Sequence, residues 1–67
     1  MNKPTNLQYY RTSQGYTQKQ LADLSEVSIR MIQGYEQGTK DINKASGITL
    51  KRLAFILECT IEDLLEL

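Results

Sequence analysis

Histidine is absent from this sequence, and cysteine occurs only once, at position 59. A single cysteine excludes a disulfide within the chain, and the lack of histidine excludes a Ser-His-Asp or Cys-His nucleophile. A zinc site would need carboxylates almost alone, which is rare among protein zinc sites. We therefore expect no metal, no cofactor and no enzymatic activity, and we expect Cys59 to serve as a small buried hydrophobic residue.

Long apolar runs are missing as well. No stretch approaches the ~20 apolar residues of a transmembrane helix, and residues 1–5 contain no apolar segment resembling a signal peptide. We expect a cytoplasmic protein that does not associate with membranes. No feature of the sequence indicates a small-molecule ligand.

What is present has the composition of a small folded domain, with 67 residues of which 40% are hydrophobic and 24% charged. Disordered chains have fewer apolar residues and more unbalanced charge. Proline occurs only at position 4, and no repeat or linker interrupts the chain. We expect residues 1–67 to form one domain.

The net charge of zero hides an uneven distribution. Residues 1–52 carry all eight lysines and arginines with four acids, whereas residues 53–67 carry the other four acids and no base. A basic body with an acidic end suits an anionic partner on one face, although a solvated acidic helix would look the same.

Apolar residues recur at helical spacing, without the sustained alternation of strands. Together with helix start and stop signals, the spacing predicts helices over residues 6–14, 18–25, 29–37 and 44–58 and a short fifth helix after Thr60. The expected inward residues are Leu7, Tyr10, Leu21, Ala22, Val27, Ile32, Tyr35, Ala45, Leu50, Leu53, Ala54, Leu57, Ile61 and Leu64. The expected fold class is all-α, with five short helices in a compact domain.

The clearest helix start is Thr17, where Gln20 three residues later completes a capping box. Ser28 is expected to cap the third helix. Asn43 is expected to cap the fourth, which places Gly47 inside that helix at a cost of roughly 1 kcal/mol relative to alanine. Residues 17–38 thus contain two short helices and a tight turn, an arrangement typical of a helix-turn-helix.

Four segments within and beside this element resemble a known family at the family's spacing. They are Thr17-Gln18-Lys19-Gln20-Leu21-Ala22, Val27-Ser28, Ile32 and Tyr35-Glu36-Gln37-Gly38. Together they resemble the Cro/phage-repressor-type helix-turn-helix family, also called the xenobiotic-response-element family, over about residues 7–65. The resemblance implies a lambda-repressor-like fold and a sequence-specific binder of double-stranded DNA, usually a transcriptional repressor that acts as a dimer.

The resemblance also implies which residues contact DNA. Gln18 falls where the family contacts a phosphate at the start of the second helix, and a helix N-terminus attracts phosphate. Ser28 is either a second phosphate contact or only a helix cap. The side chains expected to project outward from the recognition helix are Ile29, Arg30, Gln33 and Gly34. The residues expected to hold the DNA backbone beside it are Thr39, Lys40, Asn43 and Lys44.

The expected base contacts follow from side-chain chemistry. Arginine pairs with the O6 and N7 atoms of guanine, glutamine pairs with adenine, and an apolar side chain touches the thymine methyl group. Arg30, Gln33 and Ile29 are thus candidate readers of DNA sequence. In the same family, the residues matching Arg11 and Glu36 form a partly buried ion pair between the first and third helices, and we expect this structural pair here.

The sequence departs from the family at several points. Gly34 replaces a polar reader, Glu26 occupies a turn position that usually holds glycine or asparagine, and Leu24 replaces an exposed charge. These departures leave open an alternative role in protein interaction on the same fold, as an antitoxin, an antirepressor or a regulator subunit with weak or no DNA binding. Leu65 and Leu67 lie outside the inward stripe of the fifth helix, so we expect them to form a weak homodimer contact rimmed by acids.

Overall fold

The computed structural model describes residues 3–67, and helices joined by short loops make up this part of the chain, with no strand in it. In chain order the elements are α1 (Asn6–Ser13), α2 (Gln18–Ser25), α3 (Ile29–Gln37), the 3-10 turn η1 (Ile42–Lys44), α4 (Gly47–Leu57) and α5 (Ile61–Leu64). The predicted all-α class with five short helices is confirmed. Within residues 3–67, no helix is both long enough and apolar enough to cross a bilayer.

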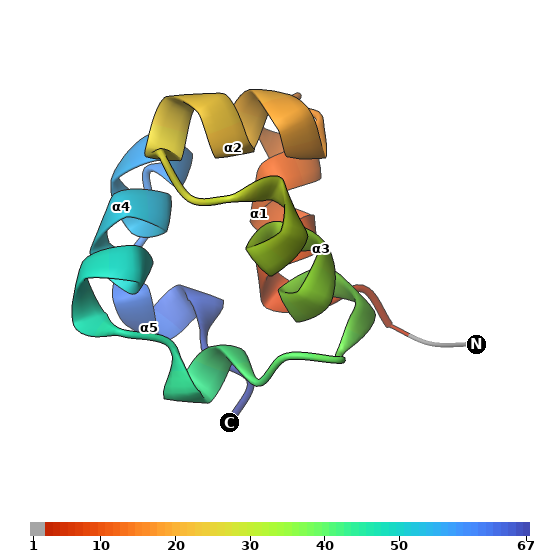
Figure 1. Cartoon of the computed structure of the whole chain (residues 1–67), viewed down its shortest axis with the longest axis vertical. Helices are drawn as coiled ribbons and strands as arrows, with labels where there is room; N and C mark the ends of the chain where they lie inside the picture. The colour runs from red at the N-terminus through yellow and green to blue at the C-terminus, as the bar shows by residue number, and fades with distance from the viewer. Residues whose placement is uncertain (1–2) are drawn as a thin grey trace.

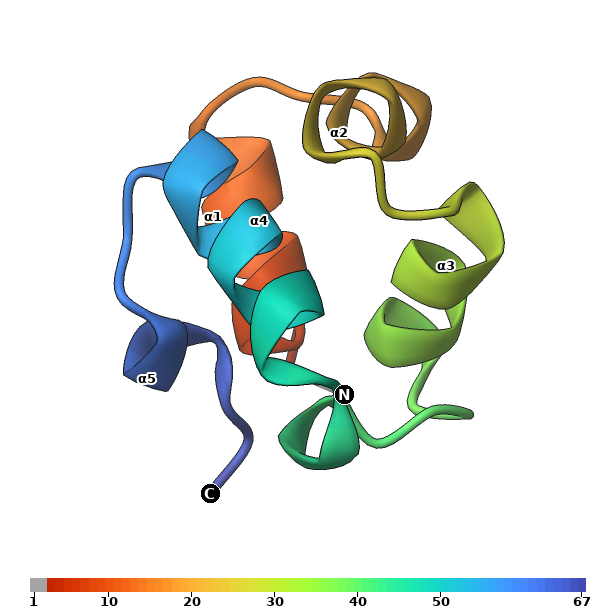
Figure 2. The same cartoon turned by 60° about the vertical axis from the view of Figure 1, so that its left-hand side comes forward.

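The helices surround a single core. Figure 1 shows α2 across one end of the molecule, with α3 and α4 below it on different sides. In agreement with this view, α2 packs against both α3 and α4, while α5 packs against α4 and α1. Figure 2, turned to bring α4 forward, shows that α3 lies well to one side of it.

Every α-helix contributes at least one fully buried side chain to this core. The fully buried side chains are Leu7, Leu21, Ile32, Leu53, Leu57 and Leu64. Each of them stabilises the fold by roughly 1.5–3 kcal/mol through burial. The expected inward residues Tyr10, Ala22, Ala45 and Ile61 are half-buried against the same core, and Ile42 of η1 joins it without having been expected.

The two helices over residues 18–25 and 29–37 begin and end where the sequence predicts. The hydroxyl of Thr17 accepts from the Gln20 N–H at 3.0 Å while the Gln20 side chain accepts from the Thr17 N–H at 2.9 Å, so the capping box is present. Between the helices, the buried Ser25 hydroxyl donates to the Leu21 carbonyl at 2.6 Å and accepts from the Val27 N–H at 3.3 Å. Ser25 therefore satisfies polar backbone groups inside the turn that sets the angle of α3.

The prediction for the fourth helix is wrong at its start. The helix begins at Gly47, and its cap is Ser46, whose hydroxyl accepts from the Thr49 N–H at 3.2 Å. Residues 42–44 form a separate 3-10 turn because the Asp41 carboxylate accepts from the Asn43 N–H at 3.0 Å. Gly47 thus stands at the first helical position and not inside the helix, where glycine would weaken it.

The fifth helix is shorter than expected and ends at Leu64. Leu65 has extended backbone angles, and its carbonyl accepts from the Asn6 side chain at 2.7 Å. The Glu66 backbone then pairs with the Asn43 side chain, through bonds of 2.8 and 3.0 Å. These bonds divert the chain from the helix, so residues 65–67 lie as an extended segment beside the start of α1.

Candidate nucleic-acid interface

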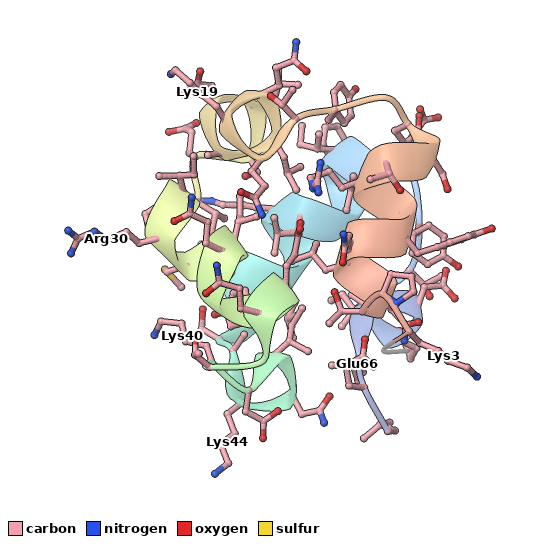
Figure 3. The ribbon with its side chains drawn as sticks, turned by 90° about the vertical axis from the view of Figure 1, so that its right-hand side faces the viewer. Lys3, Lys19, Arg30, Lys40, Lys44 and Glu66 are labelled. Carbon is pink, nitrogen blue, oxygen red and sulfur yellow. The ribbon has the colours of Figure 1, made fainter. Side chains whose placement is uncertain are left out.

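The exposed side of α3 is a candidate surface for DNA. Ile32 and Tyr35 hold the helix against the core, and its first residues, Ile29 and Arg30, are exposed. Figure 3 shows the Arg30 side chain extended away from the body of the molecule. Gln33 is half-buried one turn further along. A helix held by one face with arginine and glutamine on the other has the chemistry to read base edges.

The start of α3 is fixed by Ser28. Its hydroxyl oxygen accepts from the Met31 N–H at 3.2 Å, so the helix-capping role expected for Ser28 is present. The hydroxyl proton takes no part in that bond, and Ser28 is exposed. It can therefore still donate to a phosphate while it caps the helix.

A three-residue network ties α3 to α1 and α2. The Glu36 carboxylate accepts from Arg11 Nε at 2.7 Å and from Arg11 Nη2 at 3.0 Å, so the structure contains the expected ion pair in forked geometry. Arg11 Nη1 also donates to the Tyr16 carbonyl at 2.7 Å. The Arg11 and Glu36 side chains are only 11% and 4% exposed, so solvent screens their attraction weakly.

Gln18 belongs to the same network. Its side-chain amide donates one hydrogen to Glu36 at 3.0 Å, and the second hydrogen of this nitrogen can still donate to a phosphate. Gln18 is the first residue of α2, whose N-terminal N–H groups remain a suitable anchor for an anion. The network therefore fixes the angle between the start of α2 and the end of α3.

Gly34 does not project outward as expected from the sequence. It is buried, and a Cβ built on it would lie 2.9 Å from both Cγ and Cδ of Lys40. The Lys40 N–H donates to the Gly34 carbonyl at 3.1 Å, and the Thr39 hydroxyl donates to the same oxygen at 3.4 Å. The absence of a side chain at position 34 thus gives the Lys40 stem a place against the end of α3.

Three cations lie on one side of the molecule. Figure 3 shows Arg30, Lys40 and Lys44 extending in the same general direction, with Lys3 on the opposite side. Asn43, expected to contact DNA beside them, instead directs its side chain to the backbone of Glu66. The cations come from α3, the following loop and η1, and they are suited to phosphates on either side of a groove.

Acidic residues stand close to this surface. A shallow groove between α2 and α3 is lined by Asp23 and Glu26 together with Lys19, Ser28 and Ile29. Lys19 pairs with Asp23 at 3.1 Å across one helical turn, and both side chains are largely exposed. The single positive charge of α2 is therefore balanced locally.

The comparison with family models agrees with this geometry. A helix-turn-helix family model matches residues 7–64, which include α2 to α5 and all of α1 except its first residue. This chain belongs to the Cro/repressor-type helix-turn-helix family. Its fold is the lambda-repressor-like fold expected from the sequence, and the family is one of DNA-binding regulators and not of enzymes. No curated protein and no solved structure matches the chain.

In this helix-turn-helix domain, Leu65 is less exposed than expected, and Leu67 is as exposed as expected. Leu65 is half-buried against the core, whereas Leu67 is fully exposed. The Glu66 side chain accepts from the Asn6 N–H at the start of α1, where a helix dipole favours negative charge. Glu66 therefore does not stand as part of an acidic rim around a leucine cluster.

Two exposed apolar residues of the domain were missed by the reading of the sequence. Ile48 and Phe55 lie on α4 and are 61% and 80% exposed. Their spacing of seven residues places both on one helix face, opposite the stripe that enters the core. A search of each helix for a second apolar stripe would have found them.

The single cysteine has no feature of a reactive thiol. Cys59 is half-buried after the end of α4, and burial raises the pKa of its thiol, with a further increase from the charge of Asp63. A thiol that stays protonated is a poor nucleophile.

Proposed function

We propose that this protein is a transcriptional regulator that binds a specific site in double-stranded DNA by inserting the N-terminal half of α3 into the major groove. The observation that carries the proposal is the placement of Arg30, exposed at the start of a helix whose other face is locked into the core. Membership of a family of DNA-binding regulators supports it. Arginine at this place suits a guanine, and Gln33 and Ile29 suit the base pairs beside it.

We propose further that the protein acts as a repressor and as a homodimer. Two copies related by a two-fold axis would read a palindrome with half-sites about one turn of DNA apart, ~34 Å. The cations Lys40 and Lys44 would hold the DNA backbone beside each recognition helix. Occupation of such a site within a promoter excludes other proteins from it, and this role agrees with the cytoplasmic location expected from the sequence.

Selection of bound duplexes from a random pool tests the proposal. We expect enrichment of one sequence with two-fold symmetry, containing a guanine at the position nearest Arg30. The same selection with Arg30→Ala is the matched control, and we expect it to lose preference at that position. A pool that remains random after repeated rounds with the wild-type protein would contradict sequence-specific binding.

A further inference from the structure

Helix α4 is apolar on two opposite faces. One face carries Leu50, Leu53 and Leu57 into the core, and the other presents Ile48 and Phe55 to solvent. A helix that is apolar all round is usually covered on both sides. Within the described chain nothing covers the outer face, since Phe55 remains 80% exposed.

The exposed residues form one surface. Ile48 and Phe55 line a shallow groove of about 510 Å³ together with Cys59 and Ile61 from beyond the helix. Single exposed hydrophobic residues are ordinary, whereas several around one groove indicate a binding surface. An exposed phenylalanine beside an apolar groove is a typical anchor of protein interfaces, because its burial removes a large apolar area from water.

The charges around the groove indicate what covers it. Lys51 and Arg52 line the groove between Ile48 and Phe55, while the exposed acids Glu58 and Glu62 follow in the sequence. One end of the surface is therefore basic and the other acidic. A two-fold contact places each end of a surface against the other end of its copy. The net charge of zero adds no overall repulsion between two copies.

We propose that the groove along the outer face of α4 is covered by a second copy of this chain, with the two α4 helices antiparallel. Phe55 lies near the two-fold axis, Ile48 meets Ile61 of the partner subunit, and Lys51 faces Glu58 of the partner subunit. This contact takes the place of the leucine cluster expected at the C-terminus. The proposal rests on the proposed function in one respect only: the dimer formed by this contact is the one that would read a palindrome.

The orientation of the helices suits such a dimer. In Figure 1, α4 runs roughly along the vertical at the left edge of the molecule. Figure 3 shows that Arg30, Lys40 and Lys44 point toward the side that faces the viewer in Figure 1. A two-fold axis beside α4 along that viewing direction makes the two α4 helices antiparallel. It also leaves the cations of both copies on one side, where a single duplex can contact them.

Sedimentation equilibrium of the full chain over a wide concentration range tests the contact. We expect a monomer–dimer equilibrium whose dissociation constant rises roughly tenfold or more in Phe55→Ser, as for an aromatic anchor. Tyr9→Ser is the matched control, because Tyr9 is also exposed, at 56%, but lies outside the groove. Both substitutions are at exposed sites, and circular dichroism verifies that each variant is folded.

Charge reversal tests the orientation. Lys51→Glu and Glu58→Lys are each expected to weaken the dimer, and the double variant to recover it, because the two charges face each other across the interface. A wild-type protein that stays monomeric, equal dimerisation of Phe55→Ser and Tyr9→Ser, or no recovery in the double variant would each overturn the proposal. DNA binding is measured separately: Phe55→Ser should still bind an isolated half-site. If the protein dimerises as expected but the selection enriches no DNA sequence, that result would contradict the proposed function and not the dimer contact.

Discussion

Two glutamates adopt a backbone conformation that favours glycine. Glu26 has φ 59° in the turn between α2 and α3, and Glu58 has φ 56° after α4. The left-handed region costs a residue with a side chain about 1–2 kcal/mol. The chain accepts this cost twice, once beside the candidate DNA surface and once far from it.

Replacement by glycine separates two effects of these glutamates, the backbone strain at positive φ and the negative charge of the side chain. We expect Glu26→Gly and Glu58→Gly each to raise the free energy of unfolding by ~0.5–1 kcal/mol, because the relief of strain exceeds the entropy of glycine in the unfolded chain. Only Glu26→Gly should also tighten binding to an isolated half-site, which does not depend on the dimer, since Glu26 lines the groove that contains Ser28 and Ile29. Urea denaturation and anisotropy titrations measure the two effects. Equal changes in DNA affinity in both variants would refute this distinction.

Arg30 is the residue on which we expect recognition of the DNA sequence to depend most. We expect Arg30→Ala to weaken binding to the selected site by ~1–3 kcal/mol and to relax the preference at one base pair. Lys3→Ala serves as the control, because Figure 3 shows Lys3 on the opposite side of the molecule. An unchanged affinity of Arg30→Ala for the selected site would contradict the expectation that Arg30 contacts DNA.

At the scale of elements, the helices over residues 18–25 and 29–37 could be predicted to the residue. Their caps are local: Thr17 and Gln20 bond across one turn, and Ser28 bonds three residues ahead. Local signals of this kind can be recognised in a single sequence. The Arg11–Glu36 pair was also found, but through the resemblance to a family, because its partners are 25 positions apart.

The start of α4 and the end of α5 could not be predicted because competing or distant groups set them. Asp41, Asn43 and Ser46 are all residues that favour helix starts, and the sequence does not rank them. The diversion of residues 65–67 depends on Asn6 and Asn43, which are distant in the chain. Gly34 was expected to be exposed on α3, and its burial could not be predicted because it depends on Lys40 from the loop that follows.

The network that joins α1 to α3 gives a prediction at this scale. We expect Arg11→Met or Glu36→Leu alone to lower the free energy of unfolding by about 3–5 kcal/mol, since either change leaves a charge buried without its partner. Because the two groups are coupled, the double variant should lose less than the sum of the single losses. A double-mutant cycle in urea measures the coupling, and additive losses would mean that the forked contact stabilises nothing.

At the scale of the whole molecule, one thiol and two phenol groups that are partly or fully buried make the stability depend on pH in the alkaline range. Burial raises the pKa of Cys59 and of Tyr35, and the pKa of Tyr10 is raised by burial and by the charge of Asp63. The folded protein therefore keeps protons that the unfolded chain releases above the ordinary thiol pKa of about 8.5. By linkage, the free energy of unfolding should be constant near neutral pH and fall as the pH rises beyond that value.

Urea denaturation between about pH 7 and pH 10 tests this dependence, because this range spans the ordinary pKa values of thiol and phenol groups. Cys59→Ala should reduce the loss in the lower part of the range, because it removes the group that titrates first in the unfolded chain. A free energy of unfolding that rises with pH over this interval would contradict the predicted fall in stability.

The whole domain places three cations and the start of α3 on one side, and this arrangement is the basis of the central claim. The most direct test is the affinity for the selected duplex and for a scrambled duplex of the same composition, each measured at low and at physiological salt. We predict tighter binding to the selected duplex at both concentrations and a steep loss of affinity for both duplexes as salt rises, because phosphate contacts release counterions. Equal affinity for the two duplexes, or binding that does not respond to salt, would contradict the account.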